Sequence, residues 1–77
     1  MDLRQVFAAN LPRLRHAKSL SQEDLAYAAD VNRSYMSTLE RGASYPGLEI
    51  IGKLAAVLGV EPAELLRLPA KRRTRGR

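Results

Sequence analysis

Cysteine and tryptophan are absent from this chain of 77 residues, and histidine occurs only once. Without cysteine the chain forms no disulfide, and a structural zinc site, which takes four cysteine or histidine ligands, has too few candidates. No apolar run approaches the roughly 18 residues that a membrane span needs, and no basic segment followed by a long apolar run marks a signal peptide. We therefore expect a cytoplasmic protein with no metal, no cofactor and no membrane contact.

The excess of positive charge lies at the C-terminal end of the chain. The sequence has 13 Lys and Arg against 8 Asp and Glu, which gives a net charge of +5. Five of the basic residues follow Pro69, and the part before it is formally neutral. These five are Lys71, Arg72, Arg73, Arg75 and Arg77. We expect residues 1–69 to form one domain and residues 70–77 to be a disordered basic tail. An anion-binding surface on the domain must then come from how its charges are arranged.

Apolar residues recur at three- and four-residue spacing through most of the domain, which is typical of amphipathic helices. Pro12 lies within the first stripe, so that helix either kinks or starts late with Asn10 as its cap. No strand-like alternation occurs, and the predicted fold class is all-α with five helices. They are expected at about 3–18, 22–29, 33–41 and 48–58, with a short last helix starting at Glu61-Pro62.

Polar residues mark the ends of the two central helices. Ser21, followed three residues later by Asp24, forms a near capping box before the second helix. Asn32 is a good cap for the third helix, and Gly42 ends it. The joint between the helices is short, and the small side chain of Ala26 allows them to cross closely. This is the helix-turn-helix arrangement.

The third helix has an inward stripe and a polar outward face. At about 100° per residue, the inward side holds Asn32, Tyr35, Met36, Leu39 and Glu40. The opposite side holds hydroxyls and guanidinium groups without a carboxylate, namely Arg33, Ser34, Ser37, Thr38 and Arg41. An ordinary solvated helix mixes both signs of charge there. Such a face fits a DNA major groove about 12 Å wide, where Arg binds guanine and Ser or Thr reaches base edges or phosphates.

At this point the chain resembles the helix-turn-helix domains of the phage repressor and Cro type, also called the xenobiotic-response-element type. The resemblance covers about residues 3–68, and restriction-modification controller proteins and small phage or plasmid repressors are nearest in size. Its strongest part is Leu20-Ser-Gln-Glu-Asp-Leu-Ala to Val31-Asn-Arg-Ser-Tyr-Met-Ser-Thr-Leu-Glu-Arg-Gly42, followed by Pro46 and Leu-Gly-Val at 58–60. It implies a compact lambda-repressor-like DNA-binding domain whose second and third helices form the helix-turn-helix. Asp30 stands where the family usually has a glycine, and Asp tolerates the left-handed conformation better than most residues.

The resemblance also implies roles for the outward side chains. Arg33 is the best candidate for direct base readout. The residues expected at base edges or nearby phosphates are Asn32, Arg33, Ser34, Ser37 and Thr38. Those expected at phosphates are Gln22, Tyr35 and Arg41. Each has an alternative role, since hydroxyls satisfy local backbone groups, Tyr35 can pack, Arg41 can stabilise the helix end, and Gln22 can be solvated.

Two charged residues are assigned to the interior by the same resemblance. Arg15 and Glu40 stand where the family has an ion pair, which ties the first helix to the third. The lone His16 is assigned to the surface or the domain boundary, because no second ligand lies near it in the sequence.

The end of the fourth helix and the last helix are more apolar than one short helix needs. A single helix-turn-helix contacts few base pairs, so we expect a homodimer that places two of them about 34 Å apart on DNA. Each apolar residue here either lies in that interface or completes the monomer core. The candidates are Leu58, Val60, Leu65, Leu66 and Leu68.

The sequence therefore predicts a sequence-specific transcriptional regulator that binds an inverted repeat of double-stranded DNA as a dimer through the major groove. The alternative is a protein-interaction module on the same fold, such as an antiactivator or a toxin-neutralising antitoxin. The carboxylate-free outward face argues against that alternative. An enzyme is not expected, because His16 has no nucleophile or acid with which to form a recognisable site.

Overall fold

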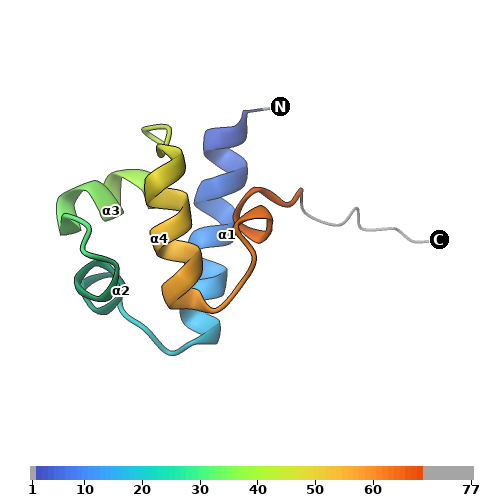
Figure 1. The fold of residues 1–77 in the computed structure, drawn as a ribbon. Helices are drawn as coiled ribbons and strands as arrows, with labels where there is room; N and C mark the ends of the chain where they lie inside the picture. Colours follow the sequence, from blue (N-terminus) through green and yellow to red (C-terminus); the bar gives the residue numbers. More distant parts are fainter. Residues whose placement is uncertain (1, 69–77) are drawn as a thin grey trace.

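The computed structural model describes residues 2–68, which form four α-helices and one short 3-10 helix (Figure 1). The elements are α1 (Leu3–Ala17), α2 (Gln22–Ala29), α3 (Arg33–Glu40), α4 (Leu48–Leu58) and the 3-10 helix η1 (Pro62–Leu66). No strand occurs within residues 2–68. The predicted all-α class is confirmed. Met1 and residues 69–77, and with them the predicted basic tail, lie outside the described residues.

The last predicted helix is a 3-10 helix and not an α-helix. It spans five residues, starts with Pro62 and is followed at Arg67 by extended backbone with φ of −72° and ψ of 129°. A segment this short closes few i→i+4 hydrogen bonds, and 3-10 geometry is common in such short pieces. The prediction of five helices is corrected accordingly to four α-helices and η1.

Helix α1 continues through Pro12 without a break. Its N-cap is Asp2, whose side chain accepts a hydrogen bond from the Arg4 backbone N–H at 2.9 Å. A late start with Asn10 as cap is therefore wrong. Asn10 is instead buried, and its Nδ2 donates to the backbone oxygens of Leu65 at 3.0 Å and Arg67 at 2.8 Å. Asn10 thus holds the C-terminal end of the described chain against α1.

The joint between α2 and α3 depends on Asp30. This residue takes the left-handed conformation, with φ of 57° and ψ of 50°. Its backbone N–H and that of Val31 then close the end of α2, with Val31 donating to the Ala26 oxygen at 2.8 Å. Ala26 and Ala29 are both buried where the helices meet. The small side chains and the left-handed turn together bring α3 across α2 at close range.

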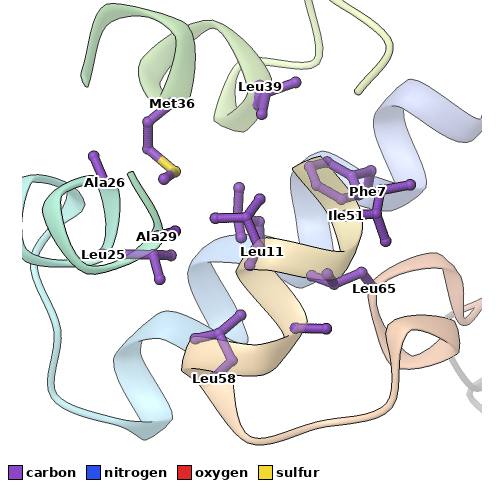
Figure 2. Packing of buried hydrophobic residues seen from close by; sticks show 12 residues of the cluster. Phe7, Leu11, Leu25, Ala26, Ala29, Met36, Leu39, Ile51, Leu58 and Leu65 are labelled. Carbon is purple, nitrogen blue, oxygen red and sulfur yellow. The ribbon is translucent and has the colours of Figure 1, made fainter. Parts of the chain in front are cut away.

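The core is built from one side of each helix (Figure 2). Figure 2 shows Met36 of α3, Leu25 of α2 and Leu58 of α4 arranged around Leu11 of α1. Burying one such side chain contributes about 1.5–3 kcal/mol relative to leaving it exposed. The largest fully buried side chains are Phe7, Leu11, Leu25, Met36, Leu39, Leu54, Leu58 and Leu65. Because Met36 and Leu39 point into this core, the opposite side of α3 must face outward.

Two structural features do not occur within residues 2–68. No helix in this range combines the length and the apolar character needed to cross a membrane. The same residues contain no cluster of three or more His, Asp or Glu side chains arranged to hold a metal ion.

Candidate nucleic-acid interface

The outward side of α3 and its C-cap carry five of the side chains that were assigned to DNA from the sequence. Arg33 and Ser34 in its first turn are exposed, Ser37 and Thr38 are half-buried, and Arg41 at the C-cap is exposed. The helix carries a single carboxylate, that of Glu40. A surface without fixed negative charge is what an approach to phosphates requires.

Glu40 does not belong to that surface, because its side chain is only 8% exposed and is paired inside the domain. Arg15 Nε donates to Glu40 Oε2 at 2.7 Å, and Arg15 Nη2 donates to Oε1 at 3.0 Å. This two-point contact joins α1 to α3. The third nitrogen, Nη1, donates to the Leu20 backbone oxygen at 2.9 Å and so fixes the loop between α1 and α2. Removing Glu40 from the surface in this way leaves the outward side of α3 without a carboxylate.

The same contacts change the ionisation of both partners. Burial disfavours the charged form of Glu40 and acts to raise its pKa, but hydrogen bonds from Arg15 and Gln22 and the charge of Arg15 outweigh burial. The pKa of Glu40 consequently lies below its ordinary value of 4.5. The hydrogen bond to Glu40 raises the pKa of Arg15, against an opposing effect of burial. Both groups are therefore charged at neutral pH.

Residues from α2 and α3 line one depression on this side of the molecule. Its volume is about 290 Å³, and its lining residues are Gln22, Arg33, Ser34 and Ser37. Gln22 is the first residue of α2, where the helix leaves backbone N–H groups without intrahelical partners. The depression therefore joins a helix start that favours anions to the first two turns of α3. Four of the residues assigned to DNA from the sequence come together here.

Side chains on this face differ in how firmly they are held. Thr38 Oγ1 donates to the Ser34 backbone oxygen at 3.0 Å, and Arg41 Nη1 donates to Ser37 Oγ at 3.0 Å. Within residues 2–68, the Arg33 side chain has no hydrogen bond or ion pair. Arg33 is thus the cation of α3 whose donors are all available to an external acceptor, whereas Arg41 already uses one of its own.

Asn32 and Tyr35 also make contacts inside the protein. The Asn32 side chain caps α3 by accepting from the Tyr35 backbone N–H at 3.2 Å, which leaves its amide N–H groups for other partners. The Tyr35 hydroxyl donates to the Tyr45 backbone oxygen at 3.4 Å. These contacts occupy one polar atom on each side chain and hold the start of α3 and the loop behind it in place.

The loop after α3 is also held by the start of α1, which sequence reasoning missed. The Arg4 guanidinium lies 4.8 Å from the centre of the Tyr45 ring, at a distance typical of a cation–π contact. Gly42 has φ of 73°, and a Cβ there would lie 2.5 Å from Gln5 Nε2. The sequence indicated only that Gly42 ends a helix. Its neighbours in the sequence gave no sign that Gln5, 37 residues away along the chain, approaches it closely.

The five candidates for a dimer interface fall into two groups. Leu58 and Leu65 have no exposed surface, because both lie in the core of the monomer, so their assignment to an interface is wrong. Val60 and Leu66 are partly buried against the core, and Leu68 is 53% exposed. Of the five candidates, these three residues are the ones that keep exposed surface in the monomer.

Comparison with known proteins places this geometry in a family. The profile of a family described as a helix-turn-helix domain matches residues 6–68. Control protein C.BamHI of Bacillus amyloliquefaciens is 39% identical over 66 residues, which cover 84% of this chain and 82% of that protein. An uncharacterised helix-turn-helix-type transcriptional regulator, y4dJ of Sinorhizobium fredii, is 38% identical over 66 residues, which cover 86% of each chain.

Solved structures agree with the sequence relatives. The restriction-modification controller protein C.AhdI from Aeromonas hydrophila superimposes with a TM-score of 0.77 at 45% identity, over 80% of this chain and 94% of that one. A hypothetical transcription factor from Neisseria, NHTF, superimposes with a TM-score of 0.87 at 42% identity, over 92% of this chain and 80% of that one. The likeness thus covers 80% of this chain or more in both structures.

Proposed function

We propose, from the premise that this chain belongs to the helix-turn-helix domain family, that it is a transcriptional regulator that binds a specific sequence of double-stranded DNA. Helix α3 enters the major groove, and the protein acts by occupying promoter DNA. The observation that carries the proposal is the depression lined by Gln22, Arg33, Ser34 and Ser37, on a side of α3 from which the only carboxylate of the helix has been withdrawn into the interior.

Each side chain has a role in the proposed complex that follows from its chemistry. Arg33, whose donors are unoccupied within residues 2–68, binds a guanine edge through two hydrogen bonds. Ser34, Ser37 and Thr38 make shorter contacts to base edges or phosphates, and the free amide N–H groups of Asn32 reach a base or phosphate beside the start of α3. The phosphate contacts are made by Gln22, Tyr35 and Arg41.

The proposed complex contains two copies of the chain on an inverted repeat. A two-fold dimer presents two α3 helices to successive turns of one face of the duplex, about 34 Å apart, and so doubles the number of base pairs read. Val60, Leu66 and Leu68 are the remaining candidates for the contact between subunits. The names of the similar proteins, which include control proteins and transcriptional regulators, support the assignment of this chain as a transcriptional regulator.

The experiment that tests the proposal is a binding-site selection from random duplexes followed by titration. We expect the selected duplex to be bound at least about a thousandfold more tightly than a random one, with affinity falling steeply as salt rises. The half-sites and their separation report whether two copies bind together. Equal affinity for all duplexes would contradict the proposal and favour a protein-interaction module on the same fold.

A further inference from the structure

Glu40 has a second contact that the Arg15 ion pair does not require. Gln22 Nε2 donates to Glu40 Oε1 at 2.9 Å, so this oxygen accepts hydrogen bonds from both Arg15 and Gln22. Gln22 belongs to α2, Glu40 to α3 and Arg15 to α1. One buried carboxylate therefore contacts side chains from both neighbouring helices, and one of these side chains also lines the depression assigned to DNA.

The chemistry of the carboxylate determines which way the Gln22 amide faces. An ionised carboxylate only accepts hydrogen bonds, so it selects the NH₂ end of the amide and rejects the carbonyl end. The lowered pKa of Glu40 keeps it ionised throughout the neutral range. A glutamine side chain that is free in solvent turns between both orientations and loses rotamer freedom on binding. Glu40 therefore holds one orientation of Gln22 before any ligand arrives.

We propose that Glu40 is a positioning residue for DNA binding, which fixes the Gln22 amide so that its second N–H and its carbonyl oxygen meet the duplex in one defined orientation. This inference rests on the proposed function and deepens it. Arg15 in turn fixes Glu40 by contacting both carboxylate oxygens. The arrangement connects the interior ion pair to the binding surface through a single hydrogen bond, so a change at the buried carboxylate reaches the surface without moving a helix.

The first test is spectroscopic and needs no DNA. The sequence contains two glutamines, Gln5 and Gln22, so each side-chain NH₂ pair is readily assigned in ¹⁵N-labelled protein. In the Glu40→Gln variant we expect the NH₂ resonances of Gln22 to move towards the chemical shifts of a solvated glutamine. The NH₂ resonances of Gln5 should stay in place. In the unchanged protein the Gln22 pair should move as acidification protonates Glu40. A Gln22 pair that responds to neither change would overturn the inference, and the acid titration decides this even if the variant does not fold.

The second test is a double-mutant cycle on affinity for the selected duplex. The four proteins are the unchanged chain, Gln22→Ala, Glu40→Gln and the double variant, compared at a temperature where circular dichroism shows all four folded. Glu40→Gln should weaken binding about three- to tenfold when Gln22 is present, as expected for one modest hydrogen bond. In the Gln22→Ala background it should weaken binding less than about twofold. Equal losses in both backgrounds would show that Glu40 does not act through Gln22.

A structural control separates positioning from general loosening of the domain. Asn10→Ala removes two hydrogen bonds between α1 and the η1 end of the chain, away from α2 and α3. It should lower the melting temperature without changing the affinity of the folded protein. If the unchanged protein prefers no duplex, the proposed function fails. If it has a preference but the cycle is additive, the positioning role alone fails.

Discussion

Two arginines mark two regions of the molecule in which the same side chain has opposite surroundings. Arg15 is 10% exposed, and three of its nitrogens donate to Glu40 and to the Leu20 backbone. Arg33 is exposed, and within residues 2–68 it has no hydrogen bond or ion pair. The two regions meet at Gln22, which donates a hydrogen bond to Glu40, the partner of Arg15, and also lines the depression together with Arg33.

The difference shows how a formally neutral domain can present a positive surface. In the interior cluster, which consists of Arg15, Glu40 and Gln22, the positive charge of Arg15 is neutralised by Glu40. This ion pair therefore gives no net attraction to an anion. The outward side of α3 keeps its cations without a compensating carboxylate, so its field is available to a partner. Stability is thus assigned mainly to Arg15 and direct recognition to Arg33. Arg33→Ala should weaken binding and leave stability nearly unchanged, whereas Arg15→Ala should lower stability and also reach the binding surface through Glu40 and Gln22.

The largest expected effect comes from breaking the interior cluster with Arg15→Ala. The substitution leaves the Glu40 carboxylate partly buried without its cation, which costs about 3–5 kcal/mol in free energy of unfolding. Urea denaturation followed by circular dichroism measures this loss. The matched control is Arg33→Ala, which should change the unfolding free energy by less than about 0.5 kcal/mol. Similar losses for both variants would remove the distinction between the two regions.

The next largest expected effect is on DNA affinity, where Arg33 matters although it contributes little to stability. Arg33→Ala should weaken binding to the selected duplex by about 1–3 kcal/mol and relax the preference at one base position, because a bidentate contact to a base is lost. Titration of duplexes that differ at single positions measures both changes. Arg67→Ala removes the same charge from an exposed position beyond η1 and serves as the control. An unchanged base preference in the Arg33 variant would count against Arg33 as the reader.

The smallest effect is the acid dependence of the interior cluster. The pKa of Glu40 is lowered in the folded protein, so its contribution to stability is complete above the ordinary value of 4.5 and is lost as pH falls through the lower folded value. Arg15 stays charged across this range. Urea unfolding between neutral pH and pH about 3 should therefore show a decline that Glu40→Gln reduces. Part of it should persist, because hydrogen bonds from Arg4 also lower the pKa of Asp2. The same decline in both proteins would contradict this assignment.

The helix-turn-helix could be predicted from the sequence because its determinants are local. Ser21 and Asp24 form the capping box, with hydrogen bonds of 2.9 and 3.3 Å, and Asn32 caps α3. The outward and inward sides of α3 follow from helical spacing alone, since Met36 and Leu39 occupy the apolar stripe. The caps and the two sides of α3 could be predicted because they depend on residues that lie within four positions of each other.

The parts that escaped prediction depend on contacts between residues far apart in the sequence. Asn10 contacts residues 55 and 57 positions further along, so its local surroundings suggested a helix cap and not a buried anchor. A usable signal was present, because Asn10 stands at helical spacing from Val6 and Leu14 on the apolar stripe of α1. The burial of Leu65 likewise depends on how η1 packs against α1 and α4, which spacing within one helix does not determine. For Leu58 a signal was present, because it stands at helical spacing from Ile51 and Leu54 on the apolar stripe of α4.

The anchoring of the chain end by Asn10 has a practical consequence for handling the protein. The hydrogen bonds to Leu65 and Arg67 keep the last described residues beside α1, on the side of the molecule opposite α3 (Figure 1). A fluorophore, affinity tag or fused reporter attached beyond Leu68 would begin on that opposite side. Labelling there leaves the depression between α2 and α3 unobstructed, whereas a label near Ser21 or Asn32 would sit beside it.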